Sequence, residues 1–92
     1  MKIRRRYVVS GSVQGVGFRY RAYYVARDMG LTGYVRNMFN GDVEVEVQGD
    51  EDSVMAFLMK VEEGHFIHID NVRTTKLEVD EFERDFSVRD SY

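Results

Sequence analysis

The segment TGYVRNMFNGDVEVEVQ, residues 32–48, contains two apolar stretches on either side of the pair Asn40-Gly41. An Asn-Gly pair between such stretches is a strong signal for a β-hairpin. In residues 42–48, valine alternates strictly with acidic or amide residues, as in a strand with one buried face. We therefore predict two antiparallel strands, over residues 32–38 and 42–48. The side chains expected to point outward from the second strand are Glu44, Glu46 and Gln48.

The register of this hairpin decides which way Asn37 points. A two-residue turn at Asn40-Gly41 would place Arg36 on the apolar face of the sheet. A three-residue loop over residues 39–41 instead pairs valine with valine and sets Arg36 opposite Glu44 on the exposed face. We prefer the second register. Asn37 then lies at the end of its strand, on the face that the valines share.

The sequence on both sides of the hairpin predicts two helices and three further strands. They are a strand over residues 4–13, a helix that begins at Phe18 and is stopped by Gly30, a helix that ends at Gly64, a strand over residues 69–79 and a short strand over residues 86–88. Residues 49–52, Gly-Asp-Glu-Asp, offer an N-cap and first-turn acids for the second helix. The order β-α-β-β-α-β with an extra C-terminal strand predicts an α+β, ferredoxin-like sandwich. In this fold an antiparallel sheet carries both helices on one face.

Composition limits the classes of protein to which the chain can belong. The 92 residues include no cysteine, which excludes a disulfide framework, a thiolate zinc site and a cysteine nucleophile. No apolar stretch is long enough to span a membrane, and the N-terminal MKIRRRYVV lacks the apolar region of a signal peptide. We therefore expect a single domain over residues 1–92, without a membrane partner and located in the cytoplasm.

Charge is distributed unevenly along the chain. Residues 1–36 carry eight basic groups and one acid, a net charge of +7, whereas residues 37–92 carry five basic and fifteen acidic groups, a net charge of −10. This asymmetry points either to an anionic partner near the N-terminal half or to ion pairs within the chain. The sequence alone leaves both interpretations open.

The stretch VQGVGFR, residues 13–19, joins the first strand to the first helix. Gly15 and Gly17 permit tight turns in which successive backbone N–H groups converge, and such a loop at a helix N-terminus is a site for an anion. The stretch has neither the Lys-Ser/Thr pair of a P-loop nor the spacing of a dinucleotide fingerprint. A purely structural turn would account for the two glycines equally well.

Arg19 and Asn37 are the two side chains that suggest chemistry beside this loop. A cation in the first turn of a helix opposes the helix dipole, so Arg19 is either compensated by a bound anion or turned into solvent. Asn37 is a polar residue on the buried face and needs hydrogen-bond partners. An amide is not a general base at neutral pH, so Asn37 either orients a water molecule or satisfies nearby loop backbone.

Three stretches together resemble the acylphosphatase family: GSVQGVGFRYRA (residues 11–22), MGLTGYVRN (29–37) and NGDVEVEVQG (40–49). The resemblance implies a hydrolase of small acyl phosphates that needs no metal or cofactor and acts as a monomer. It implies that inorganic phosphate is both product and inhibitor, and that Asn37 positions the attacking water. The phosphate would be held by Gln14, Gly15, Val16, Gly17, Phe18 and Arg19.

Other hypotheses are weighed beside this resemblance. The same loop would serve a binding module that senses phosphorylated ligands without turnover. RNA-recognition modules share the topology, but the expected outward face carries Glu44 and Glu46, which repel phosphates, so we expect no nucleic acid. His65 and His68 have the spacing of half a metal site, although loop histidines are the simpler interpretation. The tyrosines at positions 20, 23 and 24 are either helix surface or a patch for a partner.

Overall fold

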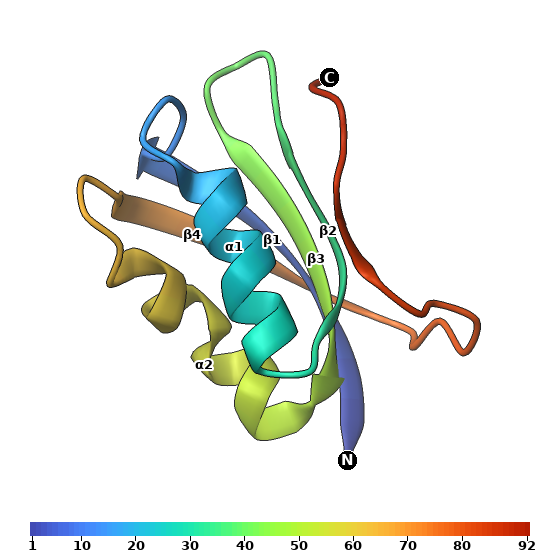
Figure 1. The fold of residues 1–92 in the computed structure, drawn as a ribbon. Helices are drawn as coiled ribbons and strands as arrows, with labels where there is room; N and C mark the ends of the chain where they lie inside the picture. Colours follow the sequence, from blue (N-terminus) through green and yellow to red (C-terminus); the bar gives the residue numbers. More distant parts are fainter.

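The computed structural model describes residues 1–92 as five strands and two helices (Figure 1). The elements are β1 (Lys2–Ser12), α1 (Phe18–Asp28), β2 (Thr32–Asn37), β3 (Val43–Asp50), α2 (Glu51–Glu62), β4 (His68–Leu77) and β5 (Phe86–Val88). Both helices lie on one face of the sheet, so the predicted α+β, ferredoxin-like order is confirmed. No helix is long and apolar enough to cross a membrane.

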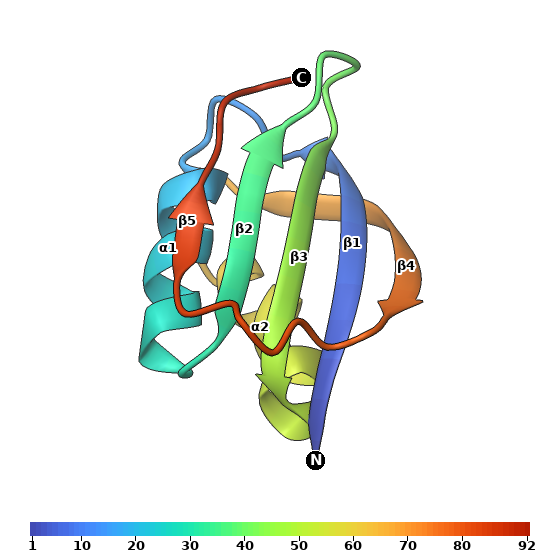
Figure 2. The ribbon, with the colours of Figure 1, turned by 90° about the vertical axis from the view of Figure 1, so that its right-hand side faces the viewer.

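The strands form one sheet in the order β4-β1-β3-β2-β5. The first four strands in this order pair antiparallel, as predicted, but β5 pairs parallel to β2, so the sheet as a whole is mixed. After β4, the chain crosses the face of the sheet that is turned away from the helices (Figure 2). It therefore reaches the opposite edge and runs in the same direction as β2.

The predicted register of the central hairpin is confirmed. Asn37 pairs with Val43 and Arg36 with Glu44, and the Met38 N–H donates to the Asp42 carbonyl at 2.8 Å. Gly41 has a φ of 97°, which is the left-handed conformation that the three-residue loop requires. The fully buried side chains that fill the space between sheet and helices include Val43, Val45, Val47, Phe18 and Phe57.

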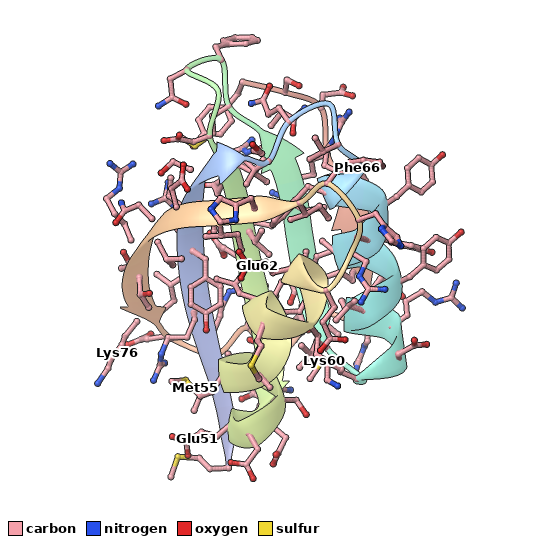
Figure 3. All side chains as sticks on the ribbon, turned by 90° about the vertical axis from the view of Figure 1, so that its left-hand side faces the viewer. Glu51, Met55, Lys60, Glu62, Phe66 and Lys76 are labelled. Atoms are coloured by element: carbon pink, nitrogen blue, oxygen red, sulfur yellow. The ribbon has the colours of Figure 1, made fainter.

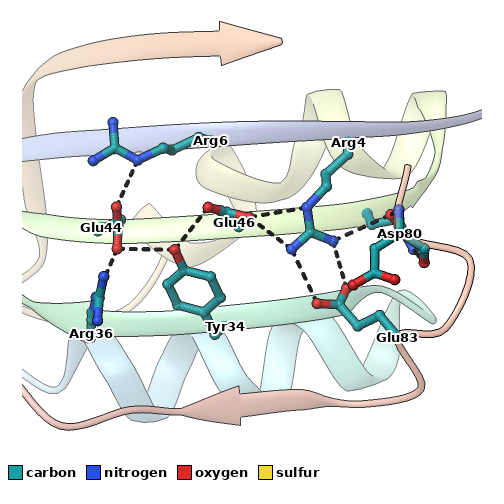
Figure 4. A network of polar contacts seen from close by, with 9 residues as sticks. Arg4, Arg6, Tyr34, Arg36, Glu44, Glu46, Asp80 and Glu83 are labelled. Carbon is teal, nitrogen blue, oxygen red and sulfur yellow. Dashed lines mark hydrogen bonds and ion pairs between the residues drawn. The ribbon is translucent and has the colours of Figure 1, made fainter. Parts of the chain in front are cut away.

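The opposite face of the sheet is not the solvent-exposed surface that we predicted. Glu44 is only 3% exposed and Gln48 only 1%, because the C-terminal segment and several arginine side chains cover them. Arg6 and Arg36 donate to the Glu44 carboxylate at 2.6 and 2.8 Å (Figure 4). Gln48 exchanges two hydrogen bonds with the backbone of Asp80 in the crossing segment.

Ion pairs on this face account for part of the charge asymmetry. Arg4 contacts Glu46 at 2.8 Å and Glu83 at 2.7 Å, joining the basic N-terminal half of the chain to the acidic C-terminal half. Burial alone would raise the pKa of Glu44, but hydrogen bonds from Arg36, Arg6 and Tyr34 outweigh burial and lower it. The pKa of Tyr34 is raised, first by burial and then by the carboxylate of Glu46. Of the two interpretations of the uneven charge distribution, ion pairs within the chain therefore apply to several of the N-terminal arginines.

The start of α2 differs from the prediction in one respect. Asp50 occupies the N-cap position, but its carboxylate makes no capping hydrogen bond and lies 3.7 Å from the N-terminal amine instead. The Glu51 N–H donates to the Met1 carbonyl at 2.9 Å, because β1 begins beside this point. Glu51 and Asp52 occupy the first turn, as predicted, and place negative charge at the positive end of the helix dipole.

Candidate active site

Residues 13–17 form the loop that carries the chain from β1 into α1. Gly15 and Gly17 have φ values of 74° and 83°, so both adopt the left-handed conformation that favours glycine. A Cβ atom added at either position would meet no other atom within 4 Å. The glycines are therefore needed for the path of the backbone rather than for close packing, and the space above the loop is open.

The backbone N–H groups of this loop have no acceptor in the protein. None of the six groups from Gln14 to Arg19 takes part in a backbone hydrogen bond, and no side chain caps α1. The first turn of α1 contains no acidic residue, in contrast to the first turn of α2. The N-terminus of α1 thus combines six free donors with an uncompensated helix dipole, which is the electrostatic requirement for binding an anion.

Arg19 adds a full positive charge at the same place. It contacts no carboxylate, whereas five other arginines lie within 4.0 Å of one: Arg4, Arg6, Arg21, Arg36 and Arg73. A guanidinium presents a planar fork of donors that matches the oxygens of a phosphate. Its lack of a protein partner keeps this fork available to a ligand.

Asn37 is brought to this loop by the hairpin register. A small cavity of about 90 Å³ is lined by residues of the loop, by Arg19 and by Asn37. The Asn37 side-chain oxygen is buried and has no hydrogen-bond partner. A buried oxygen without a partner is costly, so a water molecule or ligand is its natural complement. Arg19 and Asn37, 18 positions apart in the sequence, therefore line one cavity.

We call residues 14–19, whose backbone is predicted to hold the phosphate, the cradle. Its other residues differ in what their side chains contact. Phe18 is 1% exposed and packs in the core, and Val16 is half-buried against the core, so only their backbone is available to a ligand. The Gln14 side chain donates to the carbonyls of Met38 and Asp42 at 2.7 and 2.8 Å. This bridge ties the loop to the β2–β3 hairpin. Sequence reasoning missed it, because nothing in the order of residues shows which carbonyls a glutamine side chain will meet.

The two histidines considered as half of a metal site lie apart from this cavity. His68 contacts Asp70 at 3.0 Å with both side chains mostly exposed, and the His65 ring lies beside Phe66. No cluster of three histidine, aspartate or glutamate side chains has a geometry suited to a metal ion. The free N–H groups and Arg19 make the α1 N-terminus the better supported site.

Comparisons with known proteins agree with this fold. A family model described as Acylphosphatase matches residues 5–88. The acylphosphatase of Clostridium perfringens is 44% identical over 86 residues, covering 92% of this chain and 97% of the relative. The crystal structure of acylphosphatase from Bacillus subtilis matches with a TM-score of 0.87 at 33% identity, covering 95% of this chain and 98% of that one.

A similar domain also occurs within a longer protein. The crystal structure of full-length HypF, in its phosphate- and nucleotide-bound form, matches 99% of this chain but only 12% of its own length, with a TM-score of 0.87 and 31% identity. The fold and these matches define the class as small α+β enzymes that hydrolyse acyl phosphates. The chain belongs to the acylphosphatase family.

Proposed function

We propose that this enzyme holds the phosphate of its substrate at the N-terminus of α1 and directs a water molecule onto it with Asn37. The observation that carries the proposal is the set of six unsatisfied backbone N–H groups from Gln14 to Arg19. The six residues that carry these N–H groups are Gln14, Gly15, Val16, Gly17, Phe18 and Arg19. Each would contribute its backbone, and Arg19 would also contribute its guanidinium.

The reaction requires little proton transfer to the leaving group. The oxygen of a water molecule forms a bond to phosphorus while the bond from phosphorus to the acyl oxygen breaks. The products are a carboxylate, inorganic phosphate and the proton that the water gives up. Because a carboxylate leaves readily, catalysis consists mainly of positioning and of stabilising charge on the phosphoryl oxygens. A site without an acidic or basic catalytic side chain is adequate for this chemistry.

Arg19 and the loop N–H groups would stabilise the charge on the transferring phosphoryl group. Backbone N–H groups held by the fold of the loop would need little reorganisation during the reaction. Asn37 would accept a hydrogen bond from the attacking water through its unpartnered oxygen. That bond leaves a lone pair of the water oxygen directed at phosphorus. All of these groups come from one chain, which supports the proposal that the enzyme acts as a monomer.

Inorganic phosphate would occupy the same cradle after the reaction. It presents the same tetrahedral set of oxygens to the N–H groups and to Arg19. We therefore propose that it is a competitive inhibitor as well as a product. Phosphate inhibition then reports binding to the cradle separately from turnover.

The test measures hydrolysis of benzoyl phosphate in excess EDTA. A second series of assays measures how strongly added inorganic phosphate inhibits this hydrolysis. We expect turnover that EDTA does not reduce. Replacing Arg19 with alanine should lower kcat/KM by at least about 10²–10³-fold and weaken phosphate inhibition in parallel. Lys76→Ala removes a positive charge from β4, which forms the edge of the sheet opposite β5 (Figure 3). This control variant should change neither kcat/KM nor phosphate inhibition.

Three results would contradict the proposal. Phosphate binding without any turnover would support the binding module instead. Loss of activity in EDTA would show that a metal ion takes part. Normal phosphate inhibition in the Arg19→Ala variant would place the anion somewhere other than the cradle.

A further inference from the structure

A groove far larger than the anion cavity lies between α1 and β5. Its volume is about 1060 Å³, and its walls come from α1, from residues 30–32 and from residues 84–88. Tyr20 and Tyr24, both on α1, are 73% and 56% exposed, and their rings stack with centroids 6.5 Å apart. Phe86 and Val88 line the other wall. The groove therefore offers flat aromatic and apolar surface that the fold itself leaves uncovered.

The groove adjoins the proposed phosphate site. Arg19 and Tyr20 line both the small cavity and the groove. Arg27 lines the groove from the last turn of α1, about 12 Å from Arg19 along the helix axis at a rise of about 1.5 Å per residue. A ligand whose phosphate lies beside Arg19 would thus extend along the tyrosines toward Arg27.

The charges in the groove are positive in an otherwise acidic chain. Three arginines line it, Arg19, Arg27 and Arg84, and none of them has a carboxylate partner. Asp85 is the one acidic residue in the lining, so the groove carries a net charge of +2 while the whole chain carries −3. Arg27 and Arg84 are exposed. Unpaired cations beside apolar surface favour a ligand that has both an apolar body and an anionic group.

We propose that this groove binds the acyl part of the substrate, and that the preferred substrates are acyl phosphates with an apolar body and a second anionic group at the far end. The inference rests on the proposed function, because it takes the phosphate position from the cradle. Tyr24 would pack against the body of the acyl group. Arg27 and Arg84 would attract the distal anion.

Three acyl phosphates test this proposal: acetyl phosphate, benzoyl phosphate and 4-carboxybenzoyl phosphate. The last two differ by one carboxylate at the end of the ring opposite the phosphate. In the unsubstituted enzyme we expect kcat/KM for 4-carboxybenzoyl phosphate to exceed that for benzoyl phosphate by about tenfold at low ionic strength. The double variant Arg27→Gln/Arg84→Gln should bring this ratio close to one.

The matched control is Lys2→Gln/Lys76→Gln, which removes the same charge from β1 and β4, away from the groove. It should preserve the ratio, and added salt should reduce the ratio in the unsubstituted enzyme. Tyr24→Ala should lower kcat/KM for benzoyl phosphate relative to acetyl phosphate by several fold, on the order of 3–10.

The outcomes separate the two proposals. If acetyl phosphate is hydrolysed but the carboxylate gives no advantage, the groove does not bind the acyl group and the proposed function stands. If the ratio falls equally in both double variants, net charge rather than the groove is responsible. If none of the three substrates is hydrolysed, the proposed function itself is wrong.

Discussion

The bridge from the Gln14 side chain to the β2–β3 hairpin gives a prediction with a calculable size. Gln14→Met keeps the length of the side chain but removes its two hydrogen bonds, to the carbonyls of Met38 and Asp42. Neither carbonyl is left without a partner, because Met38 still accepts from the Gly41 N–H at 3.1 Å and Asp42 from the Met38 N–H at 2.8 Å. The cost is therefore two net hydrogen bonds, together about 1–3 kcal/mol, without the larger penalty of a buried unsatisfied group.

The assay is urea unfolding, with kcat for benzoyl phosphate measured on the same samples. We expect the free energy of unfolding to fall by about 1–3 kcal/mol and the thermal midpoint to fall by at least about 4 °C. Because the bridge also sets the distance from the loop to Asn37, kcat should fall by about tenfold. Phosphate inhibition should persist, since the backbone N–H of residue 14 is retained.

Ser12→Ala is the control, because Ser12 is exposed at the end of β1 and its side chain forms none of these bonds. Unfolding of the Gln14→Met variant at the same urea concentration as the unsubstituted enzyme, with unchanged kcat, would refute the reasoning. A loss of stability with unchanged kcat would show that the bridge supports the fold but does not position the site.

Further predictions concern the water site, the sheet and the pH response. Asn37→Ala should lower kcat by about 10²–10³-fold with unchanged phosphate inhibition. The free energy of unfolding should hardly change, because the Asn37 side-chain oxygen has no protein partner. Marked destabilisation in a melting experiment would instead show that Asn37 has a structural role. Gly33→Ala should cost at least about 2 kcal/mol in urea unfolding, more than Gly30→Ala, because the added Cβ would overlap the Glu46 carbonyl oxygen, whereas a Cβ at position 30 would meet no atom within 4 Å. The folded pKa of Glu44 lies below its ordinary value of 4.5, so its contribution is complete above that pH and is lost as pH falls through the folded pKa. Urea midpoints measured from pH 7 to pH 3 should therefore fall in acid, and fall less steeply in Glu44→Gln.

The sequence contained enough information to predict the central hairpin and the placement of Asn37 near the loop that precedes α1. Of the two hairpin registers considered, only one pairs valine with valine on the buried face of residues 42–48. That register places Asn37 on the face that carries the helices. The two glycines of the loop require unusual backbone angles that few other residues adopt. These are local constraints, which a sequence expresses directly.

What the sequence did not show depends on contacts between distant segments. The burial of Glu44 and Gln48 follows from the path of residues 78–92 over the sheet, and outward-facing polar residues give no sign of that cover. Asp50 has the residue type of an N-cap, but the nearby N-terminus takes its carboxylate. The groove likewise forms only when β5 pairs beside β2 and faces α1, which places residues 84–88 opposite the tyrosines.

The most direct test of the account is a crystal structure of the enzyme with inorganic phosphate. We expect one phosphate on the backbone N–H groups of residues 14–19, with the Arg19 guanidinium on its oxygens. A water molecule should lie between the anion and the side-chain oxygen of Asn37. A phosphate bound instead between Arg27 and Arg84, with the cradle N–H groups solvated, would contradict the central claim that the α1 N-terminus is the catalytic phosphate site.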